Sequence, residues 1–382
     1  MADTVHDHFQ RIPYRPAVDG KVEIHSGSSR HYPTLHGNLV TPEGVSARTA
    51  VLMAHPASNF LSHFLLGAFA AAGVPIMAMN TRYAANEAAL LMERAAEDLG
   101  AGVRWLREKH GFERVVLLGF SGGGPLMSFY QSQAENSSIT RTPTGDAVSL
   151  DGLIPADGLM LVGAHPGRAR VLRNWIDPAV VDESDPYRTD PALDLYTPER
   201  ELPLPSDWVA EYRDAQLGRI RRIDAWAHEQ LARSAGRPGA DRAFVVHRTV
   251  ADPRFVDVTI DPSDREPGSL YGDPRAANWA AGGLARFVTA RSWLSTWSEE
   301  HTQASAPSDL AGVKAPTLVM ALRGDQAAFV GESREMHAAS ADPHAELIEM
   351  PHLTHYLVDQ PEGLGQIIEH LRSWLVQREL VG

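Results

Sequence analysis

The chain has 382 residues, contains no cysteine and carries a formal charge of −13, from 35 basic and 48 acidic residues. The lack of cysteine excludes disulfide bonds, thiolate catalysis and cysteine-ligated metal centres. The acidic balance argues against a nucleic-acid-binding protein, which normally presents a concentrated basic face. Apolar stretches such as residues 64–74 are too short to span a membrane, and the polar first residues lack the apolar core of a signal peptide. We therefore predict a cytoplasmic protein with no membrane span and no nucleic-acid partner; the sequence is compatible with a homo-oligomer.

Buried strands and amphipathic helices alternate in the first part of the chain. The expected elements are an irregular arm over residues 1–20, strands over 21–25, 34–40 and 48–54, a helix over 59–72, a strand over 74–79, a helix over 87–110, a strand over 115–118, a helix over 125–134 and a strand over 158–162. This order predicts a doubly wound, mostly parallel α/β sheet.

The alternation stops after residue 164 and resumes after residue 308. The intervening sequence indicates proline-rich loops, a long amphipathic helix over 206–235, a hairpin that joins 243–249 to 255–260, and a helical, tryptophan-bearing stretch over 274–300. A strand over 317–322, a helix over 331–339, a strand over 345–349 and a helix over 363–378 then follow. We therefore predict an α/β core of residues 1–164 and 309–382, interrupted by a mainly helical cap of residues 165–308.

The turn Gly119-Phe120-Ser121-Gly122-Gly123 joins a buried strand to a helix. A catalytic serine needs its hydroxyl lifted clear of the fold, and glycines must flank it because side chains there would clash. The pattern GxSxG is weak alone and strong between a strand and a helix. A phosphate-binding P-loop is excluded because the Gly-Lys-Ser/Thr ending is missing. Ser121 is therefore the predicted nucleophile.

With this turn the chain resembles the α/β-hydrolase superfamily, in which serine, acid and histidine follow in that order, the last two after late strands. The resemblance implies that Asp325, just beyond the strand over 317–322, is the acid, and that His355, after the strand over 345–349, is the base. His355 precedes Tyr356, as family histidines often precede an aromatic residue. His352 competes for the role of base, and Glu332 and Asp342 are more distant alternatives for the acid.

The resemblance also implies an oxyanion hole made by two backbone amides. One comes from Gly122. The other comes from the loop after the strand over 48–54, where the family often carries His-Gly and this chain has His55-Pro56-Ala57-Ser58-Asn59. Proline cannot donate, so Ala57 is the predicted second donor, although Ser58 and Asn59 could simply cap the next helix. The candidate substrate contacts are Phe120, Ser58, Asn59, Arg82 and Tyr83.

The expected activity is hydrolysis of a carboxylic ester or lactone of a small organic substrate through an acyl-enzyme. The same triad could instead cleave a carbon–carbon bond of a β-diketone or an amide, and a non-catalytic ligand-binding member of the fold is a third alternative. We expect no cofactor and no metal. The pair His6 and His8 near the N-terminus is not expected to bind a metal either. The cap is rich in aromatic residues and arginines that could contact substrate or serve its own packing; the arginines are Arg213, Arg219, Arg221, Arg222, Arg233, Arg237, Arg242, Arg248 and Arg254.

Overall fold

One eight-stranded sheet organises the protein. The computed structural model describes residues 5–13, 34–44, 46–84, 86–198, 200–237 and 239–381. In spatial order the strands are β1 (Val5–Pro13), β2 (Thr34–Pro42), β4 (Ile76–Asn80), β3 (Thr49–His55), β5 (Arg114–Phe120), β6 (Gly158–Val162), β9 (Thr317–Leu322) and β10 (Glu346–Met350). The first two pairings are antiparallel and all others are parallel. The mostly parallel sheet predicted from the sequence is therefore confirmed.

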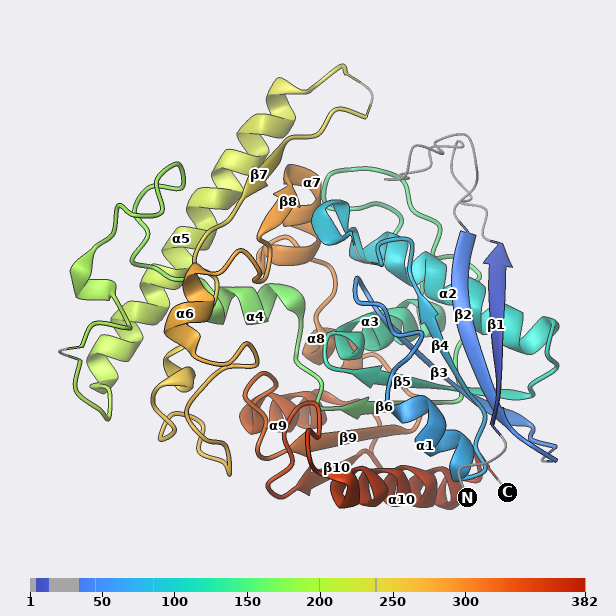
Figure 1. Ribbon diagram of the computed structural model, residues 1–382. Coiled ribbons are helices and arrows are strands. Elements are labelled where there is room, and N and C mark those ends of the chain that lie inside the picture. The colour runs from blue at the N-terminus through green and yellow to red at the C-terminus, as the bar shows by residue number, and fades with distance from the viewer. Residues whose placement is uncertain are drawn as a thin grey trace.

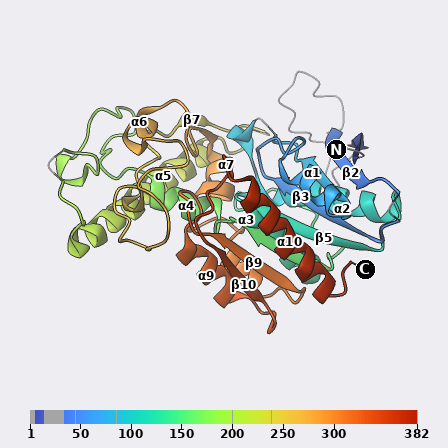
Figure 2. The ribbon, with the colours of Figure 1, turned by 60° about the horizontal axis from the view of Figure 1, so that its bottom comes forward.

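The central strands are continuous apolar runs because helices cover both faces of the sheet. Every residue of β3, β6 and β9 is buried. Helices α1 (Leu65–Ala71) and α10 (Pro361–Gln377) share one hydrophobic cluster with one face of the sheet. The opposite face packs against α2 (Met92–Glu108), α3 (Gly123–Glu135), α8 (Ala306–Leu310) and α9 (Val330–Ala339). Figure 2 shows α10 lying in front of the sheet.

The chain between β6 and β9, which we call the inserted segment, forms a separate body beside the sheet (Figure 1). Its own core gathers Ile220, Trp293 and Trp297 with nine other buried residues. Its elements are α4 (Arg168–Trp175), η2 (Pro191–Leu193), α5 (Ser206–Arg233), β7 (Ala243–Val245), η3 (Pro253–Phe255), α6 (Pro274–Trp279), β8 (Phe287–Thr289), α7 (Ala290–Ser292) and the π-helix η4 (Trp293–Trp297). Its last residues return to the sheet, since Ala304 and Ala306 lie in the core cluster beneath it.

The predicted hairpin in the inserted segment is wrong. Strand β7 pairs with β8, so that Ala243 lies opposite Thr289 rather than a residue of 255–260. The Asp252 side chain accepts a hydrogen bond from the amide of Arg254 and caps a 3-10 turn, η3, where the second strand was expected. A strand pairing across more than 40 residues leaves no local pattern in the sequence.

Other predicted elements also differ from the structure. Residues 5–13 were assigned to an irregular arm and form strand β1, whose antiparallel pairing with β2 uses backbone hydrogen bonds that need no apolar pattern. The helix expected from residue 59 begins at Leu65, because the side chains of Asn59 and His63 accept backbone amide hydrogen bonds in a preceding turn. The stretch over 274–300 is not one helix, since it contains β8. The strand predicted over 21–25 lies outside the described residues.

Candidate active site

Ser121 stands on a sharp turn between β5 and α3. Its φ of 53° lies in the left-handed region, which a non-glycine residue adopts at a cost and which is often found at functional sites. The neighbouring glycines are required by close contacts. A Cβ on Gly119 would lie 2.6 Å from the Cα of Gly124, and one on Gly123 would lie 2.4 Å from the carbonyl oxygen of Ala54. The backbone therefore forms the strand–turn–helix that the sequence predicted for a nucleophile.

A chain of hydrogen bonds runs from Ser121 into the protein. The hydroxyl of Ser121 lies 3.0 Å from Nε2 of His355, and Nδ1 of the same ring lies 2.6 Å from Oδ2 of Asp325. The other carboxylate oxygen of Asp325 accepts hydrogen bonds from the amides of Ala327 and Ala328. Asp325 and His355 are 1% and 4% exposed. The carboxylate is therefore fixed by the backbone and in turn orients the imidazole toward the serine.

The competing residues lie elsewhere. The side chain of His352 is 81% exposed, and its closest charged neighbour is Asp264 at 3.7 Å. Glu332 pairs with Arg254 at 2.9 Å. Asp342 accepts hydrogen bonds from the amides of Thr317 and His344. None of these three contacts Ser121 or His355 in the described structure.

Two histidines that the sequence analysis did not single out crowd the turn. A Cβ on Gly122 would lie 2.5 Å from Nε2 of His55 and 3.2 Å from Nε2 of His165. Burial is the main cause that lowers the pKa of His55 well below its usual value, and the neighbouring Arg168 lowers it further. Burial likewise lowers the pKa of His165 to about 3. Both rings are therefore neutral at physiological pH.

The amide of Ala57, the predicted second oxyanion donor, bonds to the ring of His55. It donates to Nδ1 of His55 at 3.1 Å, and the amide of Ser58 donates to the same nitrogen at 2.8 Å. Pro56 has no amide hydrogen to donate, so the two donors to the imidazole are the amides that follow it in the loop. Since Nδ1 accepts two hydrogen bonds, the proton of the neutral ring resides on Nε2. The histidine thus presents an N–H donor beside Gly122.

A cavity of about 530 Å³ opens above Ser121. The sheet side contributes Ser121, His55 and Ser58, and the inserted segment contributes His165 and most of the other lining residues. The other residues that line it are Asn86, Glu87, Ala88, Arg168, Val171, Trp175, Leu270, Tyr271, Ala281, Gly282, Gly283, Leu284, Arg286, Phe287, Ala327 and Tyr356. A concave site of this size suits a small organic molecule.

The structure places only some of the predicted substrate contacts in this cavity. Ser58 lines it. Phe120 is buried behind the site, with its ring centroid 5.1 Å from that of His355. Asn59 bonds to Asn80 and does not line the cavity. The prediction is wrong for Arg82 and Tyr83: Arg82 pairs with Asp98 at 2.6 Å, and Tyr83 is fully buried in the core of the sheet domain.

Sequence reasoning missed several lining residues for identifiable reasons. His165 follows β6, and the carboxyl ends of parallel strands commonly supply ligand-binding residues, so its position did carry a signal. Arg286 lies in the inserted segment, just before the strand β8 that local patterns did not reveal. Of the aromatic residues in that segment, Trp175, Tyr271 and Phe287 line the cavity, whereas Trp293 and Trp297 build the segment's own core.

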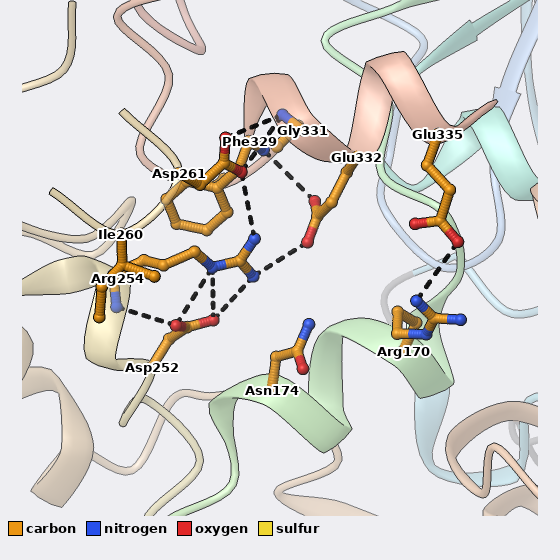
Figure 3. Close-up of polar contacts among 12 residues, drawn as sticks. Arg170, Asn174, Asp252, Arg254, Ile260, Asp261, Phe329, Gly331, Glu332 and Glu335 are labelled. Carbon is orange, nitrogen blue, oxygen red and sulfur yellow. Dashed lines mark hydrogen bonds and ion pairs between the residues drawn. The ribbon is translucent and has the colours of Figure 1, made fainter. Parts of the chain in front are cut away.

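A buried ion-pair network ties the inserted segment to the core near the acid (Figure 3). Arg254 contacts Asp252 at 2.8 Å within its own segment and Glu332 at 2.9 Å on helix α9. Asp261 accepts a hydrogen bond from the amide of Gly331 at the start of the same helix. Because α9 follows the loop of Asp325, this network joins the inserted segment to the part of the core that follows Asp325.

The fold and the strand–turn–helix with its serine, histidine and carboxylate define an α/β-hydrolase fold. No protein family matches the sequence, and no curated protein matches it significantly. Solved structures share the fold. The α/β-hydrolase GrgF from Penicillium sp. sh18 is 11% identical, with 97% of this chain and 99% of that chain covered and a TM-score of 0.54. DcsB, solved with a substrate analogue, is 14% identical, with coverage of 97% and 100% and a TM-score of 0.51. A hypothetical protein from Pseudomonas aeruginosa is 13% identical, with coverage of 95% and 94% and a TM-score of 0.50.

Within the described ranges, no group of three or more histidine, aspartate or glutamate side chains is arranged to hold a metal ion. Among the same residues, every helix falls short of the length and apolarity needed to cross a bilayer.

Proposed function

We propose that the protein is a serine hydrolase that cleaves a carboxylic ester or lactone of a small organic substrate through an acyl-enzyme. The observation that carries the proposal is the unbroken hydrogen-bond chain from Ser121 through His355 to Asp325, at the base of a cavity. In this proposal residues 165–308 act as a cap that supplies the cavity's outer wall. The cytoplasmic location stays a prediction.

The mechanism follows from the positions of the three side chains. Serine is a poor nucleophile at neutral pH unless a base removes its proton during attack. His355 takes the proton of Ser121 through Nε2 and returns it to the leaving alcohol. Asp325 keeps the proton of the ring on Nδ1 and stabilises the imidazolium that forms. Water then attacks the acyl-enzyme by the same route, with His355 again as base.

The negative charge that develops on the substrate oxygen needs donors beside Ser121. We assign one donor to the amide of Gly122 and the second to Nε2–H of His55. This assignment rests on the tautomer that the amides of Ala57 and Ser58 impose, and on the position of Nε2 against Gly122. A neutral imidazole that is already oriented stabilises the oxyanion without reorganisation during the reaction.

A fluorophosphonate probe tests the nucleophile. It reacts with serines that are activated by a general base, so it is expected to label the wild type at Ser121 and to leave Ser121→Ala unlabelled. Intact-protein and peptide mass spectrometry locate the adduct. Absence of labelling in the folded wild type, or labelling at another serine, would refute the proposal.

A substrate panel separates the chemistries that this triad can perform. Short-chain esters and lactones are expected to be hydrolysed, while matched amides and β-diketones are expected to be turned over far more slowly, because an alcohol is a better leaving group than an amine or a carbanion. Product formation is followed by chromatography. Turnover of β-diketones alone would replace the ester reaction with carbon–carbon bond hydrolysis.

Replacing His55 tests the second oxyanion donor. We expect His55→Phe to lower kcat by about 10²–10³, the usual effect of removing one such donor, with KM changed less than about threefold. His55→Gln, whose amide can donate, is expected to recover part of the loss. His63 provides a matched control: its Nδ1 also accepts a backbone amide, burial lowers its pKa to about 4, and it does not line the cavity. If His63→Phe and His55→Phe lowered kcat equally, the assignment to His55 would be wrong.

A further inference from the structure

The cap wall of the cavity contains a buried arginine without a carboxylate partner. Arg286 is 5% exposed and lines the same cavity as Ser121. Among the described residues no aspartate or glutamate forms an ion pair with it, and its Nε has no hydrogen-bond partner. Its remaining contacts are long, at 3.4 Å to Nδ1 of His247 and 3.4 Å to the carbonyl oxygen of Gly282.

This arrangement is unlike that of the neighbouring buried arginines. Arg219 pairs with Glu183 at 2.8 Å, and Arg248 pairs with Asp177 at 2.7 Å. Arg265 has carbonyl oxygens around its guanidinium and does not line the cavity. Burial is the main cause that lowers the pKa of Arg286, and Arg219 adds to it, yet a guanidinium stays protonated in proteins. A charge that is buried without a partner is costly unless a ligand supplies one.

A second buried donor lies beside the arginine. The hydroxyl of Thr249 is fully buried and has no hydrogen-bond partner among the described residues. Both groups converge on Gly283, a lining residue: a Cβ there would lie 2.8 Å from the hydroxyl and 3.1 Å from Nη2 of Arg286. Arg286 itself lines the cavity, whereas the Thr249 hydroxyl lies behind the backbone of Gly283.

The charges around the cavity favour an anion although the whole chain carries −13. The lining contains two arginines, Arg168 and Arg286, and one glutamate, Glu87, with which Arg168 forms an ion pair. The lining histidines His55 and His165 are neutral, since burial lowers the pKa of each. Arg286 is thus the one lining charge that the described residues do not balance.

We propose that the substrate carries a carboxylate and that Arg286 binds it while the ester or lactone carbonyl lies at Ser121. This inference rests on the proposed function. A guanidinium gives a carboxylate two parallel, charge-assisted hydrogen bonds, which fix orientation as well as affinity. Arg286 is then the specificity-determining residue of the hydrolase.

Matched esters test the inference. Monobutyl esters of the linear C4–C8 dicarboxylic acids carry the carboxylate on the acyl side, and butyl esters of the corresponding monoamides are neutral counterparts of nearly equal size. A second pair of series places the carboxylate or carboxamide on the alcohol side. For at least one chain length we expect wild type to prefer the carboxylate by about tenfold to a hundredfold in kcat/KM, as charge-assisted hydrogen bonds allow.

Variants test whether Arg286 causes the preference for the carboxylate esters. Arg286→Gln is expected to bring the ratio to within about twofold, and Arg286→Lys is expected to retain an intermediate ratio. Arg221→Gln is the control, since Arg221 lies on the exposed face of α5 and pairs with Glu300. A ratio near one in the wild type across all series, or a ratio that survives Arg286→Gln, would overturn the inference.

Binding to the unreactive variant separates this inference from the proposed function. Calorimetry on Ser121→Ala is expected to show that the carboxylate half-esters bind more tightly than their carboxamide counterparts, and that the additional Arg286→Gln change removes the difference. Equal binding of both would refute the anion site even if every ester were hydrolysed. Preferential anion binding with no ester turnover and no fluorophosphonate labelling would instead refute the hydrolase and leave the anion site standing.

Discussion

His355→Ala is expected to lower kcat for ester hydrolysis by about 10⁴–10⁶, the range seen when the base of a serine triad is removed. The reason is geometric. Nε2 of His355 is the base within hydrogen-bond reach of the Ser121 hydroxyl, at 3.0 Å, and Asp325 fixes its other nitrogen. Without the imidazole, neither attack by the serine nor departure of the alcohol has a proton carrier. Stopped-flow and steady-state assays on one activated ester measure the loss, with KM expected to change little.

His352→Ala is the matched control for this variant. It removes a histidine from the same loop, three residues away, whose side chain is 81% exposed and contacts Asp264 rather than the site. Its kcat is expected to stay within about twofold of wild type, because the side chain contacts neither Ser121 nor His355. If His352→Ala lost activity and His355→Ala kept it, the assignment of the base would be reversed.

The catalytic geometry was accessible from the sequence because local patterns encode it. Ser121 follows a continuous apolar strand and precedes a helix, and glycines mark the turn at the contacts that permit no side chain. Asp325 and His355 each follow a strand of the parallel sheet, so the topology brings their distant positions to one edge. The sequence therefore predicted that these three side chains lie together, while their catalytic roles stay a proposal.

The residues of the cavity wall could not be predicted from the sequence in the same way. Arg286 reaches the cavity through the pairing of β7 with β8, which joins segments more than 40 residues apart. The second oxyanion donor was assigned to Ala57 from the resemblance to the family, but the amide of Ala57 bonds to Nδ1 of His55. The proposal of His55 as the donor in place of Ala57 depends on the rotamer and the tautomer of the His55 ring. A sequence pattern specifies neither. The proposed specificity residue and the proposed second oxyanion donor could therefore be identified only from the tertiary structure.

Arg254→Met is expected to lower the free energy of unfolding by about 3–5 kcal/mol at pH 8, as found when one partner of a buried ion pair is removed. The guanidinium is 7% exposed and stands between Asp252 and Glu332 (Figure 3). Asp252 keeps a second cation, Arg213 at 2.7 Å, so most of the loss arises at Glu332. Urea denaturation followed by tryptophan fluorescence measures the change, and Arg221→Met, which breaks an exposed pair with Glu300, is expected to cost less than about 1 kcal/mol.

The pH dependence of this loss identifies its cause. Burial is the main cause that raises the pKa of Glu332, even though Arg254 opposes it. Removing Arg254 raises that pKa further, so folded Glu332 binds a proton that the unfolded chain releases. A carboxyl group with a higher pKa in the folded state lowers stability as pH rises through the two pKa values. The destabilisation of Arg254→Met relative to wild type is therefore expected to be larger at pH 8 than at pH 5. A deficit that is equal at both pH values would show that lost packing against Phe329, rather than an uncompensated carboxylate, destabilises the variant.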